Sequence, residues 1–150
     1  MQRRTRNRIC IWIIFSGLLN FLVYTVIYAE LGGDAKNGGN GKFLNEAGEV
    51  EEGLYISGHF IRGAGGGKAK GVATWVWIYS YLHSISLWPT QGAMVICMLI
   101  LARPHIIATL GESNWIRGPT FIAVVMTLVA VLCSVLTVWF TTQFIVDLTA

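Results

Sequence analysis

The sequence contains few charged residues. Asp, Glu, Lys and Arg together make up 13% of the 150 residues, about half of their share in a typical soluble domain. Hydrophobic residues make up 54%, and the mean hydropathy is +0.58. These values indicate an integral membrane protein, so the lipid bilayer is its first expected partner. The basic residues flank apolar runs instead of covering a polar face, so we expect no binding to nucleic acid.

Cysteine and histidine are scarce, with three of each. Cys10, Cys97 and Cys133 all lie in apolar runs, and they predict neither a disulfide framework nor a CxxC metal site. Among the histidines, only His83 lies in an apolar run, so paired haem ligation would need a second copy of the chain. The sequence therefore predicts no cofactor and no metal site.

Motifs for nucleotide binding and catalysis are also lacking. Gly63 to Gly71 (GAGGGKAKG) looks at first like a phosphate-binding loop, but the positions of the first glycine and of the Ser or Thr hold Arg62 and Ala69. We interpret this segment as a flexible linker. No pair of aspartates, and no serine with a base on a neighbouring apolar run, predicts intramembrane hydrolysis, so we expect no enzymatic activity.

Three apolar runs are long enough to cross a bilayer, and they cover residues 9–29, 73–102 and 119–146. Four arginines precede the first run and predict a cytoplasmic N-terminus by the positive-inside rule. The alternative for the first run is a cleaved signal peptide, but the apolar core of such a peptide is shorter. We therefore predict a single integral membrane domain over residues 1–150, with an all-α fold of three transmembrane helices.

Two loops join these spans. Residues 30–72 form the predicted extracytoplasmic loop and hold thirteen of the seventeen glycines, a density that suits turns and flexible connections. Within it, Gly53 to Arg62 has the composition of a short strand or β-hairpin, with Gly58 at its turn. Residues 103–118 form the predicted cytoplasmic loop, because Arg103 and Pro104 are typical of the end of a span.

The second span carries polar residues along one side. At 100° per residue they form a single stripe, and Pro89 predicts a kink beside it. Lipid cannot satisfy such groups, so the stripe faces protein or trapped water. Matching the three spans by depth adds residues from the first and third. The predicted intramembrane polar cluster consists of Asn20, Ser80, His83, Ser84, Gln91, Ser134 and Thr137.

Three interpretations of His83 remain open. It can be a neutral structural side chain that bonds Ser80 or a neighbouring span, it can carry protons, or it can ligate haem or a metal. Asn20 and Gln91 have two interpretations, as hydrogen-bonding links between helices or as part of a transport pathway.

The third span repeats small and hydroxyl residues at alternating spacings of four and three. Such a seam lets two membrane helices approach closely with a left-handed crossing. The predicted helix-packing seam consists of Ala123, Thr127, Ala130, Ser134, Thr137 and Thr141. Chance enrichment of alanine and threonine in an apolar span is the alternative.

Several short stretches resemble a group of small bacterial inner-membrane proteins to which no activity is attached. They are GGDAKNG (Gly32 to Gly38, a GGDAxNG-type loop after the first span), GLYISGH, and YSYLHSIS at the start of the second span. The resemblance implies a bacterial inner-membrane location and no mechanism. We predict a non-enzymatic accessory, scaffold or assembly component that packs with other membrane subunits or with itself. The alternative is a small oligomeric transporter or proton-conducting protein built around His83 and Gln91.

Overall fold

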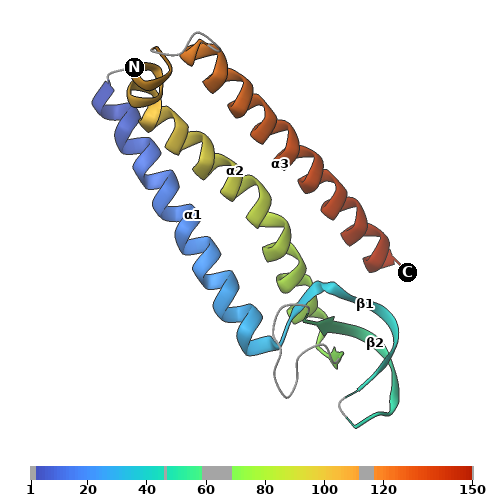
Figure 1. Cartoon of the computed structure of the whole chain (residues 1–150). Coiled ribbons are helices and arrows are strands. Elements are labelled where there is room, and N and C mark those ends of the chain that lie inside the picture. Colours follow the sequence, from blue (N-terminus) through green and yellow to red (C-terminus); the bar gives the residue numbers. More distant parts are fainter. Residues whose placement is uncertain (1–2, 46, 59–68, 112–116, 150) are drawn as a thin grey trace. The chain divides into compact units, whose positions relative to one another are not determined.

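In the computed structural model, residues 3–45, 47–58, 69–111 and 117–149 are described. This part of the chain is mostly helical and adds a small three-stranded sheet. The elements in chain order are α1 (Arg3–Leu31), β1 (Asp34–Leu44), β2 (Val50–Ser57), β3 (Lys70–Gly71), α2 (Thr74–Gly111) and α3 (Gly118–Thr149) (Figure 1). The three predicted helices are confirmed, but the fold is not purely α-helical.

All three helices present large apolar side chains outward. Trp12 on α1 is 67% exposed, and Leu128 and Val138 on α3 are 63% and 66% exposed. A helix of a soluble protein buries one apolar stripe and turns a polar face to water, whereas these helices have apolar residues on their exposed faces. Each of them is long and apolar enough to cross a membrane.

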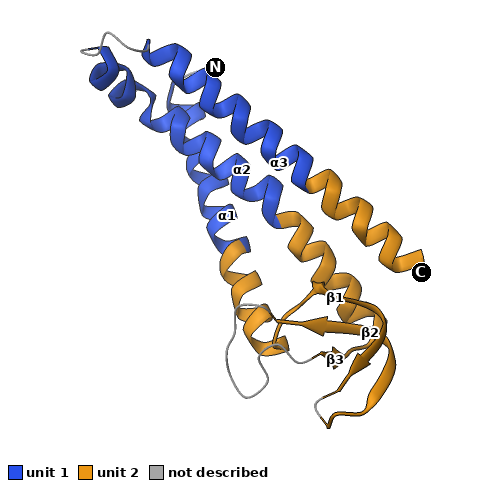
Figure 2. Ribbon diagram, turned by 45° about the vertical axis from the view of Figure 1, so that its right-hand side comes forward, with its two compact units in different colours: residues 1–20, 87–136 blue, residues 21–86, 137–150 orange. Residues whose placement is uncertain are grey.

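Helix α2 is longer than the sequence predicts. Arg103 and Pro104 were expected to end the second span, but the helix continues through Pro104 to Gly111. Proline removes one hydrogen bond, to the carbonyl of Ile100, and a helix can continue past it by bending. Figures 1 and 2 show the end of α2 turned out of line with the preceding part of the helix. Residues 112–116 of the predicted cytoplasmic loop lie outside the described residues.

The glycine-rich loop contains the sheet, in the order β1-β2-β3 with antiparallel pairing. The predicted strand is confirmed over Gly53 to Ser57, which belong to β2, and the loop does contain an antiparallel hairpin. Its two strands are β1 and β2, with Leu44 opposite Val50, and both precede Gly58, so the predicted turn at Gly58 is wrong. Residues 59–68, which include most of the predicted linker, lie outside the described residues. The last two linker residues, Lys70 and Gly71, form β3.

Close backbone contact requires glycine at one position within β1 and at the position just before it. A Cβ atom at Gly38 would overlap the carbonyl oxygen of Tyr55 on β2, and one at Gly33 would overlap the carbonyl group of Ser57. Gly33 also has a φ of 154°, which side chains disfavour. Two of the glycines that suggested a flexible loop thus allow the chain around the start of β1 to approach β2.

The chain divides into two compact units (Figure 2). Unit 1 contains residues 1–20 and 87–136, which are parts of all three helices. Within it, Gly17 of α1 lies against Thr90 and Met94 of α2, and Gly92 of α2 lies against Cys133 of α3. Two glycines therefore allow close helix contacts in this unit.

Unit 2 contains residues 21–86 and 137–150, and therefore includes the sheet. Its core cluster consists of Ala35, Ile56, Trp77 and Tyr81, each no more than 1% exposed. Phe144 of α3 packs against this cluster. The strands and the helix segments of unit 2 thus share one core, which a sheet of this size rarely builds alone.

Candidate functional site

The end of α1 places a carboxylate beside the helices. The amides of Gly32 and Gly33 donate to the carbonyl of Tyr28 at 3.1 and 3.0 Å, and Gly32 has a φ of 79°. This is the usual way for glycine to end a helix, because it adopts a left-handed conformation without strain. The chain therefore reverses, and Asp34 comes next to Tyr24.

The side chain of Asp34 accepts four hydrogen bonds from described residues of unit 2. Its Oδ2 accepts from the hydroxyl of Tyr24 at 2.6 Å and from that of Ser84 at 3.1 Å. Its Oδ1 accepts from the backbone amide and the side-chain amide of Asn37, at 2.9 and 2.8 Å. The side chain is 4% exposed. Four donors from α1, α2 and β1 therefore converge on one buried carboxylate.

Ser80 of α2 makes a second connection to β1. Its Oγ accepts from the backbone amide of Ala35 at 3.1 Å, and its carbonyl accepts from the hydroxyl of Ser84 at 3.0 Å. Both serines are almost fully buried. The polar residues at the start of α2 thus hold the first two residues of β1.

Aromatic rings surround these contacts. The His83 ring lies edge-on to Tyr24 and Tyr79, with centroid separations of 5.5 and 5.6 Å. On another part of the same helix, Tyr81 donates a hydrogen bond to Asp147 of α3 at 3.0 Å. The Nζ of Lys36 on β1 lies 5.0 Å from the centroid of a phenylalanine ring of α3, at position 140, a cation–π contact.

In unit 1, polar side chains link α1 to α2. The side-chain amide of Asn20 donates to the hydroxyl of Thr90 at 3.0 Å. The amide of Gln91 donates to the carbonyl of Gly17 at 3.4 Å. Both bonds join different helices, as expected for polar groups that link membrane helices.

The seven residues of the predicted polar cluster fall into both units. Asn20, Gln91 and Ser134 belong to unit 1, while Ser80, His83, Ser84 and Thr137 belong to unit 2. Ser84 bonds Asp34 and Ser80 bonds the backbone amide of the next residue, Ala35, while Asn20 and Gln91 each bond the neighbouring helix. Ser134 is exposed on the surface of α3.

Sequence reasoning did not find the centre of the site. Asp34 between glycines indicates a turn, and Asp147 near the end of the chain was not included in the cluster. A usable signal was nevertheless present. Asp34 is an acidic residue that directly follows an apolar run containing Tyr24, and α2 begins with two serines one turn apart.

The helix-packing seam of α3 lies mostly on the surface of the chain. Five of its residues are exposed, and Thr137 is half-buried. The contact with α2 in unit 1 uses Cys133 instead. The seam therefore remains accessible to another helix.

The hydrogen-bonding capacity of the Asp34 carboxylate is filled by its neighbours. The single hydroxyl proton of Ser84 is shared between Asp34 Oδ2 at 3.1 Å and the carbonyl of Ser80 at 3.0 Å. The four acceptor positions of the Asp34 carboxylate are matched by four neutral donors. Comparison of the chain with protein-family models, with curated proteins and with solved structures gave no match.

Proposed function

We propose that this protein is a non-enzymatic accessory, scaffold or assembly component of a membrane complex. In this proposal it is one integral domain in a bacterial inner membrane, with three spans and a cytoplasmic N-terminus. The sheet then lies on the extracytoplasmic side. Other membrane subunits, or further copies of the chain, are its partners.

The observation that carries this proposal is the exposed seam of α3. Ala123, Thr127, Ala130, Ser134 and Thr141 are all exposed in the single chain. Small residues at this spacing support close packing between membrane helices, and α3 does not use Ala130 or Ser134 where Gly92 and Cys133 meet. A helix from another chain would therefore complete the packing of α3.

The polar contacts also support a structural role. Ser80, Ser84 and Tyr24 connect the helices to β1 through Asp34 and Ala35. Their effect is to hold the small sheet against the helix ends. A sheet held in this way suits the recognition or positioning of another protein at the membrane surface.

Native mass spectrometry after gentle extraction tests the proposal. We expect the 16.5 kDa chain to appear in a larger complex, and we expect Ala130→Leu with Ser134→Leu to release it. The matched control is Val131→Leu with Val135→Leu, which enlarges two outward residues of the same helix that are 55% and 57% exposed. A wild-type chain that is always monomeric and without partners would contradict the proposal.

The second candidate is a small oligomeric transporter or proton-conducting protein. Its support is the position of Tyr24, whose hydroxyl donates to Asp34 and whose ring contacts His83. Three spans enclose little space, so this function needs a homo-oligomer. This candidate predicts that the protein forms one defined oligomer and that His83→Ala abolishes the flux of substrate or protons into vesicles. The control is His105→Ala, a change at an exposed residue, which should retain that flux. Unchanged flux for His83→Ala would exclude this candidate.

A further inference from the structure

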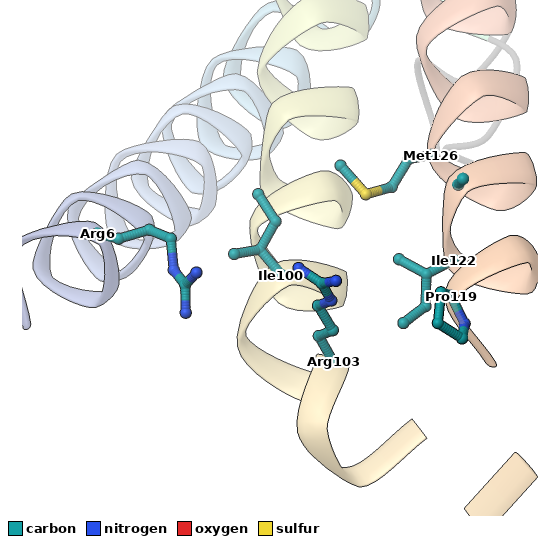
Figure 3. Close-up of a pocket in the computed structure, with 7 residues that line it drawn as sticks. Arg6, Ile100, Arg103, Pro119, Ile122 and Met126 are labelled. Carbon is teal, nitrogen blue, oxygen red and sulfur yellow. The ribbon is translucent and has the colours of Figure 1, made fainter. Parts of the chain in front are cut away.

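A second feature lies in unit 1. A cavity of about 380 Å³ opens where the beginning of α1, the later part of α2 and the beginning of α3 meet. Arg6 and Arg103 line it together with Ile100, Ile122 and Met126. Figure 3 shows Arg6 extending from α1 toward Ile100, and Arg103 rising beside the same residue. The cavity thus combines two guanidinium groups with an apolar wall.

The arginines have few anionic neighbours. The sequence of unit 1 contains one acidic residue, Glu112, which lies outside the described residues, against six arginines. The six are Arg3, Arg4, Arg6, Arg8, Arg103 and Arg117. In the part of the chain that is described, the Nε of Arg6 is buried and has no hydrogen-bond partner. A buried guanidinium donor without an acceptor is costly, so this cavity favours an anion.

The shape of the lining selects the kind of anion. Guanidinium groups bind phosphate oxygens in a paired geometry. A free phosphate ion is small and fully hydrated, and it would gain nothing from Ile100, Ile122 and Met126. A phospholipid carries a phosphate next to acyl chains, and the arginines before the first span lie at headgroup depth. Basic pockets between membrane helices bind lipid headgroups in this way.

We propose that Arg6 and Arg103 bind the phosphate of an anionic phospholipid, whose acyl chains pack on Ile100, Ile122 and Met126. The lipid supplies the acceptor that the Nε of Arg6 lacks, and it links α1, α2 and α3 within unit 1. This site does not depend on the proposed accessory function, since it requires only the membrane and this chain.

Native mass spectrometry of the full chain with defined lipids tests the site. The probes are phosphatidylglycerol and phosphatidylcholine with identical acyl chains, so that they differ only in headgroup. We expect the wild-type chain to retain phosphatidylglycerol about tenfold more strongly, and Arg6→Gln with Arg103→Gln to lose that preference. The matched control, Arg3→Gln with Arg4→Gln, removes the same charge from two exposed residues and should keep the preference.

Two further measurements distinguish a lipid phosphate from free phosphate and test the site without relying on variants that could misfold. Inorganic phosphate at millimolar concentration should not displace the lipid; if it does, the site is an anion site and the lipid proposal is wrong. The wild-type melting temperature in detergent should rise with phosphatidylglycerol and not with phosphatidylcholine, a test that needs no variant. No preference in the wild type, or an equal loss of preference in the Arg3→Gln with Arg4→Gln control, would each overturn the proposal.

Discussion

The buried carboxylate of Asp34 is compensated by neutral hydrogen-bond donors among the described residues. Burial of an isolated charge costs several kcal/mol, and hydrogen bonds to a charged group each contribute roughly 1.5 to 3 kcal/mol. Asp34 receives four such bonds, from Tyr24, Ser84 and twice from Asn37. The balance between the cost of burial and these hydrogen bonds depends on all of them, so the stability of the protein should be sensitive to small changes at this side chain.

Replacement of Asp34 by Asn should therefore destabilise the protein. The amide keeps the shape but turns two donors toward groups that also donate, and we expect a loss of about 2 kcal/mol, or roughly 4 to 8 °C in melting temperature. Thermal melting in detergent measures it. Glu49→Gln makes the same charge change at an exposed residue and should shift melting little; an equal shift for both variants would contradict the role of Asp34.

A second residue-scale prediction concerns the link between α1 and α2. Asn20→Leu removes the bond to Thr90, and a single polar bond between membrane helices contributes about 0.6 to 2 kcal/mol. We expect a lower melting temperature in detergent. The control is Thr25→Leu on the exposed side of α1, where the hydroxyl bonds the carbonyl of Phe21 on the same helix. If Asn20→Leu is neutral, the linking role of Asn20 is wrong.

At this scale the sequence predicts half of the site. Ser80 and Ser84 are found because helical periodicity places them on one side of α2. Asp34 is missed because its partners lie 10 and 50 residues away in the sequence. No local sequence pattern predicts contacts between residues so far apart. These contacts are seen only when the end of α1 and the start of α2 are placed together in the structure.

At the scale of the elements, small residues set the distance between helices. A Cβ atom built at Gly92 would lie 2.6 Å from the Sγ and 3.0 Å from the Cβ of Cys133. The first distance is shorter than real contacts of a Cβ atom and the second is tighter than most of them, so Gly92→Ala should push α3 away from α2 and lower the melting temperature.

The glycine at the end of α2 provides the control. A Cβ atom at Gly111 would meet nothing within 4 Å, so Gly111→Ala should be neutral or slightly stabilising through helix propensity. Addition of Cys133→Ala to Gly92→Ala removes the closest clash and should restore part of the loss. Equal melting of the Gly92 and Gly111 variants would show that close packing at this point is unimportant.

The elements themselves differ in how far the sequence predicts them. The three helices follow from long apolar runs, because length and composition alone decide whether a helix can cross a bilayer. The end of α2 was misplaced because Pro104 bends the helix and does not end it. Strand β1 was missed because glycine is a poor strand former by itself, while close pairing with Tyr55 and Ser57 demands it.

For the whole molecule, an odd number of spans has a simple consequence. If α1, α2 and α3 each cross the membrane once, the two termini lie on opposite sides. The arginines before α1 predict an inner N-terminus, so a reporter fused after Ala150 should be active on the outer side. A reporter that is active in the cytoplasm would overturn either the number of crossings or the orientation.

The most direct test of the account asks whether Asp34 fastens the sheet to the helices. Hydrogen–deuterium exchange of the wild type and Asp34→Ala, in the same nanodiscs, reports on the backbone amides of each element. We predict that the amides of β1 and β2 exchange about tenfold faster in the variant, while those of α1 before Asn20 are unchanged. Identical exchange of both strands in a folded variant would contradict the central claim.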